Sequence, residues 1–145
     1  MLDQLPPHHY HTVLVWYLVQ HSLSSFQKIL QHFSSCQQAT QPTRFSEWQQ
    51  LGLHANHLKR LDEFQTPQGQ QKFEQLLELV RQHSDFILTP EDLGYPTQLL
   101  PYLDKPPILL VRGKLKFYYN HKLHWSAVES RAHMADKWLM ILLTT

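Results

Sequence analysis

The chain of 145 residues has few cysteines, few glycines and no long hydrophobic run. Cys36 is the only cysteine, which excludes an internal disulfide framework and a cysteine-cluster metal site and favours a reducing, cytoplasmic compartment. The apolar run at residues 13–19 is too short to span a membrane, so no membrane partner is expected. The glycines are isolated from one another, which excludes a Walker-type or Rossmann-type phosphate loop.

The chain also has little net charge. Its 13 Lys and Arg residues and 12 Asp and Glu residues give a net charge of +1. This balance excludes a polycationic surface, so any grip on nucleic acid must come from local patches. Asp85, Glu91, Asp92 and Asp104 are scattered acids without a paired spacing or a nucleophile beside them. We therefore expect no enzyme activity and no cofactor. The length suits one ordinary domain with a core.

The first half of the chain has helical periodicity. Ser22 is a plausible cap for a helix, and Ser46 is a plausible cap for a shorter one that Gly52 closes. Polar residues 34–43 are expected to form a loop, and residues 66–69 form a predicted turn because they contain proline and glycine. Apolar spacing predicts helices at residues 8–20, 23–33, 48–51, 54–64 and 71–83.

The second half begins with strand signals. Residues 85–90 and 107–111 are short apolar runs, and a helical turn started by Pro96 is expected between them. This order predicts a βαβ-like beginning. The fold class is therefore α+β or α/β, with a small helical module joined to an open α/β domain.

The stretch from Tyr95 to Gly113 resembles a segment of the DNA-processing protein A family (DprA, also called Smf). The family pattern is Tyr-Pro, a leucine, a Pro-Pro pair, an apolar strand and Arg-Gly. The resemblance covers about residues 8–113 and is strongest over 86–113. The matching positions are expected to be structural, because the prolines restrict the chain before a strand and the glycine releases it into the next turn. They are Tyr95, Pro96, Pro106, Pro107, Arg112 and Gly113.

The resemblance implies a sterile-alpha-motif-like module, with Trp48 in a short helix, followed by a Rossmann-like core. Members bind single-stranded DNA during natural transformation, help to load the RecA recombinase, and form dimers through the core. Their main DNA pocket surrounds a Gly-Ser-Arg turn that this chain does not contain. No DNA-binding residue is therefore carried over, and the dimer surface is expected to be missing.

Residues 114–145 contain no glycine or proline, although the family core should continue here with a strand and a glycine-bearing turn. We tested whether this tail is an out-of-frame reading. Joining the third base of each codon to the first two of the next forces Leu at Phe117-Tyr118 and Tyr118-Tyr119, and Gly at Met134-Ala135. The other junctions permit I-L-L-Q-P-Q-I-A-L-V-G-S-R, which is an apolar strand followed by the missing turn.

This reading implies the loss of one nucleotide, or the gain of two, near residues 114–116. The alternatives are a natural alternative C-terminus and a foreign tag. We expect the tail to be poorly ordered. The predicted division is then a sterile-alpha-motif-like module at 1–83, the start of a Rossmann-like core at 84–113, and an aberrant tail at 114–145.

Two rival functions rest on the helical module. It could act without the core as a protein-interaction module, through an exposed helical face. Alternatively, residues 51–53 resemble the hairpin of a helix-hairpin-helix phosphate binder, to which Lys59 and Arg60 could add cationic contacts. A simple glycine cap with a solvated basic pair explains the same residues. His8 and His11 have a metal-binding spacing, but no carboxylate or cysteine completes a site nearby, so no metal is expected.

Overall fold

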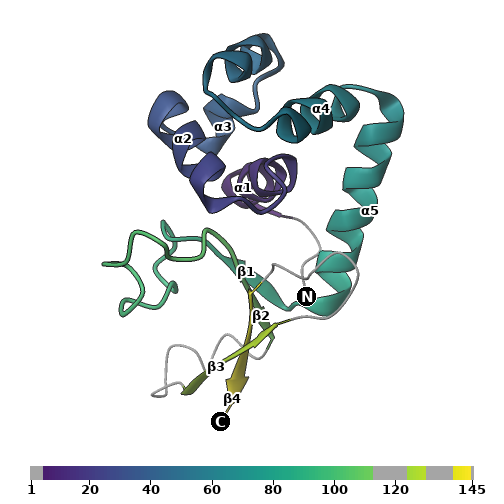
Figure 1. Ribbon diagram of the computed structural model, residues 1–145. Helices are drawn as coiled ribbons and strands as arrows, with labels where there is room; N and C mark the ends of the chain where they lie inside the picture. The colour runs from purple at the N-terminus through teal and green to yellow at the C-terminus, as the bar shows by residue number, and fades with distance from the viewer. Residues whose placement is uncertain (1–4, 113–123, 130–138, 145) are drawn as a thin grey trace. The chain divides into compact units, whose positions relative to one another are not determined.

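The computed structural model describes residues 5–112, 124–129 and 139–144, and the chain divides into two compact units (Figure 1). The first unit, the helical unit, comprises residues 5–76. The second unit continues from Leu77 and contains a small sheet. The fold is thus α+β, with helices first and strands after them. None of the described helices combines the length and the apolar character that a membrane span requires.

The helical unit is built around its first helix. This helix, α1, begins at Pro7, where a proline is tolerated because the first helical N–H groups have no partner within the helix. Its buried residues include Val13, Leu14, Trp16 and Leu18, which cover more than one face. The helix predicted at residues 8–20 is confirmed. The helices are α1 Pro7–Leu18, α2 Leu23–Phe33, α3 Cys36–Ala39, the 3-10 helix η1 Pro42–Gln50, α4 Ala55–Phe64 and α5 Pro67–His83, which runs on into the second unit.

Side-chain caps define where several helices begin. The Ser22 hydroxyl accepts a hydrogen bond from the Ser25 N–H at 3.4 Å, so the predicted cap of α2 is confirmed. The Ser35 hydroxyl accepts from the Gln38 N–H at 3.1 Å in the same way and starts α3. The loop predicted for residues 34–43 is therefore wrong in part, because this second serine cap nucleates a short helix within it.

Two further helix starts differ from the prediction because a proline begins each helix. The 3-10 helix η1 starts at Pro42 and not at a cap on Ser46, and the Arg44 N–H already donates to the Gln41 carbonyl at 2.8 Å. Pro67 is likewise the first residue of α5, where a turn was expected. The Thr66 hydroxyl accepts from the Gly69 N–H at 3.1 Å and caps this helix.

Two aromatic groups fill the core of the helical unit. Trp48 is fully buried, and its indole N–H donates to the Ala39 carbonyl at 2.9 Å. Phe73 is also fully buried, and its ring lies 5.6 Å from Tyr10, 5.3 Å from Tyr17 and 5.7 Å from Phe64, centroid to centroid. The Trp48 hydrogen bond joins η1 to α3, and the Phe73 contacts join α5 to α1 and α4.

Acid should weaken one ion cluster of this unit. The Glu47 carboxylate accepts from Arg44 at 2.7 Å and contacts His32 at 3.0 Å, and these hydrogen bonds lower the pKa of Glu47 to about 2. A lowered folded pKa stabilises the fold above the ordinary value, and this contribution is lost as the pH falls toward 2. We expect Glu47→Gln to lower the melting temperature at neutral pH, with the difference from the parent chain vanishing by about pH 2. Glu63→Gln, at an exposed carboxylate of α4, is the control; a gap that persists in acid would contradict the assignment.

The second unit contains a four-stranded sheet in the order β1-β2-β4-β3 (Figure 1). Strand β1, Phe86–Leu88, pairs with β2, Leu109–Arg112, and the two run antiparallel with Ile87 opposite Leu110. The predicted βαβ-like beginning is wrong at this point, since it requires parallel strands joined by a helix. No α-helix joins β1 to β2, because the connection contains Pro90, Pro96, Pro101, Pro106 and Pro107.

The structure places two more strands where the sequence led us to expect a poorly ordered tail. Strand β4, Leu139–Thr144, runs parallel to β2, and β3, His124–Glu129, runs antiparallel to β4. The apolar run in β4 suits a strand that lies between two others. The remaining tail residues and Gly113, the last position of the family motif, lie outside the described part of the chain.

Candidate nucleic-acid interface

The predicted hairpin lies between η1 and α4. Gly52 has φ +68°, the left-handed conformation that glycine adopts readily and that its place after a helix predicts. The Leu51 N–H donates to the Trp48 carbonyl at 3.2 Å as the helix ends. Lys28 reaches the hairpin from α2, and its ammonium group donates to the Gly52 carbonyl at 3.3 Å. The hairpin therefore has a cation attached to its backbone.

The two predicted basic residues have different surroundings. Lys59 is exposed on α4. The Arg60 guanidinium donates to the Tyr17 carbonyl at 3.2 Å and lies 4.7 Å from the centroid of the Tyr17 ring. This hydrogen bond and cation–π contact attach α4 to the end of α1, so Arg60 has a structural role in the helical unit. Neither residue lines the cleft beside the hairpin.

A cleft of about 480 Å³ opens next to Gly52, between the start of α2 and the start of α4. We call it the α2–α4 cleft. No acidic residue lines it, and hydroxyl, imidazole and ammonium groups supply its polar surface. Its lining residues are Ser22, Ser24, Ser25, Lys28, Gly52, Leu53, His54 and His57.

Hydrogen bonds connect several of the side chains that line this cleft. The Ser25 hydroxyl and His57 Nδ1 are 3.2 Å apart, and both residues are buried. The Ser22 hydroxyl contacts those of Ser24 at 3.2 Å and Ser25 at 3.3 Å. Burial lowers the pKa of His57, and the positive charges of His54 and Arg60 lower it further. The imidazole of His57 is therefore harder to protonate than that of an exposed histidine.

Sequence reasoning did not find the cleft. Lys28 lies 24 positions before Gly52, and Ser25 lies 32 positions before His57, so neither pair is visible as a local motif. The only local signal is the group of serines at the start of α2, of which Ser22 caps the helix.

The family-motif residues of the second unit make structural contacts. Tyr95 is buried, and its hydroxyl donates to the Pro106 carbonyl at 2.7 Å, which closes the loop between the two halves of the motif. Burial also raises the pKa of Tyr95 to about 12. Pro96 starts a turn, because its carbonyl accepts from the Leu99 N–H at 3.0 Å. Arg112 Nε donates to the His83 carbonyl at 2.6 Å. All four residues thus take part in contacts within the second unit.

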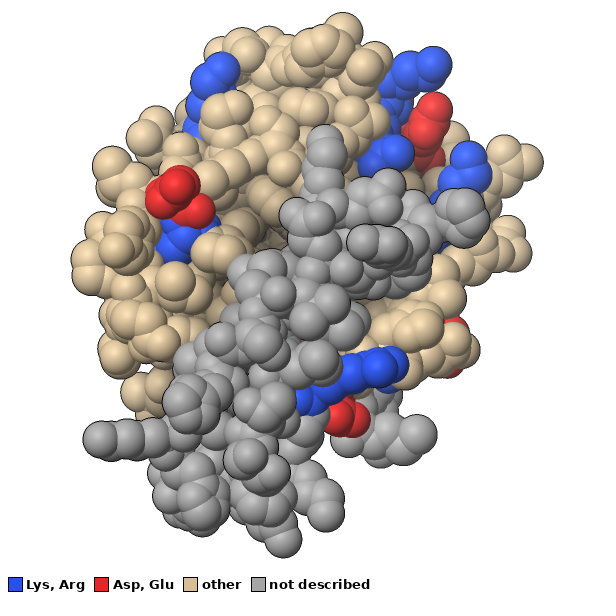
Figure 2. All heavy atoms as spheres, turned by 60° about the horizontal axis from the view of Figure 1, so that its bottom comes forward, with Lys and Arg blue, Asp and Glu red and all other residues tan. Residues whose placement is uncertain are grey.

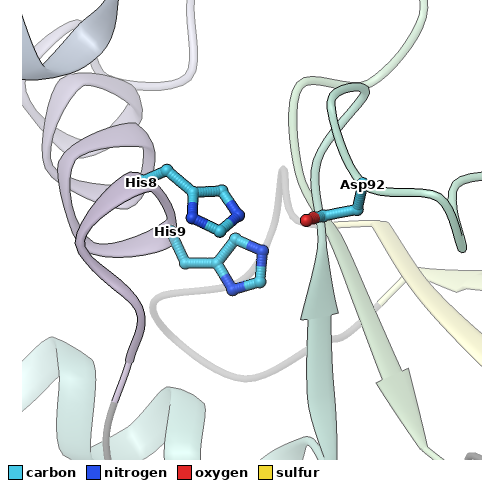
Figure 3. Close-up of side chains that lie close together, drawn as sticks. All are labelled: His8, His9 and Asp92. Atoms are coloured by element: carbon cyan, nitrogen blue, oxygen red, sulfur yellow. The ribbon is translucent and has the colours of Figure 1, made fainter.

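The histidines near the N-terminus, whose spacing was noted in the sequence, point to different neighbours. Figure 3 shows His8 and His9 projecting from the first turn of α1, with ring centroids 4.1 Å apart. His11 is directed elsewhere, since its Nδ1 lies 2.8 Å from the Thr40 hydroxyl. Asp92, also drawn in Figure 3, belongs to the second unit, where its carboxylate accepts from the Thr89 N–H at 2.7 Å.

Comparisons with known proteins add no relative to this description. Neither the protein-family models, nor the curated proteins, nor the solved structures contain a match to the chain. Surface charge is also dispersed: on the face drawn in Figure 2, the described Lys and Arg side chains stand singly or beside an acid and form no continuous basic patch. Any interface with nucleic acid on this chain would therefore have to be local, as the net charge of +1 predicts.

Proposed function

We propose that this chain carries the helical module and the opening strands of a protein of the DNA-processing protein A family. The order of its elements supports the proposal, since a helical unit precedes a strand, a proline-rich loop and a second strand, as the family order requires. The observation that carries it is the hydrogen bond from Tyr95 to the Pro106 carbonyl at 2.7 Å. This hydrogen bond joins the Tyr-Pro part of the motif to the Pro-Pro part. The contact explains why the two parts occur together in one sequence.

The proposed function is non-enzymatic handling of single-stranded DNA, in which complete members pass the strand to the RecA recombinase in the cytoplasm. The family pocket lies at a Gly-Ser-Arg turn that follows the strand after Arg112. In the present reading frame the chain has no such turn. We therefore propose that the chain as read is impaired and binds single-stranded DNA weakly.

The decisive experiment restores the reading frame. The coding DNA across residues 114–135 is read first, and codons that do not spell I-L-L-Q-P-Q-I-A-L-V-G-S-R in the shifted frame would end the proposal. The frame-restored protein and the present chain are then titrated with fluorescent oligodeoxythymidine at low salt, because phosphate contacts are strongest there. We expect the restored protein to bind at least about tenfold more tightly, with the steeper salt dependence of added phosphate contacts. Equal affinities would refute the proposed function.

A further inference from the structure

We infer that the α2–α4 cleft of the helical unit binds a phosphate group, presented either by a nucleic-acid backbone or by a free phosphate compound. The inference goes beyond the proposed function, because it concerns the helical unit and not the DNA pocket of the family core. It rests on the juxtaposition of Lys28, the Gly52 backbone and the serine hydroxyls at the start of α2.

The chemistry of the lining suits an oxyanion. Ser22 and Ser24 present hydroxyl groups, Lys28 an ammonium group, and His54 an imidazole. Phosphate oxygens accept hydrogen bonds from all of these groups, and those from a charged donor are the strongest. Because no carboxylate lines the cleft, no internal anion competes for these donors.

The geometry around Gly52 leaves room for a ligand to approach. A Cβ atom built on Gly52 would meet no atom within 4 Å, so this side of the backbone is open. The ammonium group of Lys28 is held at the same place by its 3.3 Å hydrogen bond to the Gly52 carbonyl. An ammonium group has three donors, so this bond leaves the others for a ligand. The cation is thus positioned at the cleft before a phosphate binds.

His57 reports on the charge inside the cleft. The His57 imidazole, on α4, contacts the hydroxyl group of Ser25 on α2. Positive charge on His54, at the start of α4, or on Arg60 of the same helix disfavours protonation of His57. A phosphate in the cleft would offset these charges and favour the imidazolium form. Phosphate binding should therefore raise the pKa of His57.

The test uses the full chain and inorganic phosphate at constant ionic strength, with chloride as the reference anion. The ring signals of His57, assigned with His57→Gln, are followed by NMR across a pH series. We expect phosphate to raise the pKa of His57, and Lys28→Ala to weaken phosphate binding about tenfold, since a charge-assisted hydrogen bond is lost. Lys72→Ala, at an exposed lysine of α5, is the matched control and should leave binding unchanged. Circular dichroism checks that each variant is folded.

A second arm with oligodeoxythymidine identifies the source of the phosphate. Loss of both ligands on Lys28→Ala supports a nucleic-acid backbone, whereas binding of inorganic phosphate alone supports a free phosphate compound. The inference is overturned if phosphate leaves the His57 pKa unchanged, or if Lys72→Ala weakens binding as much as Lys28→Ala. DNA binding that depends on Lys59 and not on Lys28 would exclude a nucleic-acid backbone as the source of the phosphate. None of these outcomes depends on the frame-restored core, so the two proposals fail separately.

Discussion

Replacing Trp48 with alanine is expected to destabilise the helical unit by about 3–5 kcal/mol, the largest effect of any single substitution we propose. Trp48 has 0% exposed surface, and its indole packs against Phe33 and Phe45 at centroid distances of 6.4 Å. Alanine would leave a cavity the size of an indole ring. It would also leave the Ala39 carbonyl, which accepts from the indole N–H at 2.9 Å, without this partner.

The size of this effect is a large fraction of the stability of an ordinary domain. Urea unfolding followed by circular dichroism measures it without relying on tryptophan fluorescence. Trp48→Phe is the matched control, because it keeps an aromatic ring and removes the N–H donor. We expect it to cost less than the alanine substitution. A Trp48→Ala variant as stable as the parent chain would show that η1 does not pack as described.

Replacing Gly69 with alanine is expected to destabilise the helical unit by about 2–4 kcal/mol. In an ordinary exposed helix the same change is stabilising by up to about 1 kcal/mol, so the predicted sign is reversed. A Cβ atom on Gly69 would lie 1.8 Å from the Glu63 carbonyl oxygen and 2.8 Å from the Phe64 Cα. Both are backbone atoms of α4, which cannot move aside as a flexible side chain can.

The same urea experiment measures this prediction, with Gln70→Ala as the control. Gln70 is the next residue of α5 and is exposed, so its replacement should change the free energy of unfolding by less than about 0.5 kcal/mol. A stabilised Gly69→Ala variant would mean that α4 and α5 do not approach each other this closely.

Local patterns predicted most of the helices. Helix α2 was predicted with its exact bounds, because Ser22 offers a cap and the apolar residues from Phe26 to Phe33 recur at helical spacing. Such signals lie within a few residues of one another and need no tertiary information. The junction at Thr66 was ambiguous, since Pro67 and Gly69 suit a turn as well as the first turn of a helix. The close approach of α4 and α5 at Gly69 agrees with the helix.

The candidate site could be predicted only in part. The glycine hairpin at Gly52 was visible because a left-handed residue after a helix has a strong sequence preference. Lys28 and His57 were not, since each meets its partner from a different helix. For Arg60, sequence indicated a cation and the structure shows its contact with Tyr17, which no spacing along the chain could reveal.

By itself, the sequence determined that the first half of the chain is helical and that two short strands follow the helices. It also excluded a cysteine-cluster site, because the chain has one cysteine. These features depend only on local periodicity and composition. Tertiary structure alone decided the direction of those strands. Short apolar strands such as Phe86–Leu88 and Leu109–Arg112 can pair in either direction. Their backbone hydrogen bonds and the helix-free connection between them make the pair antiparallel. The α2–α4 cleft likewise exists only in three dimensions, since folding brings Lys28 to Gly52.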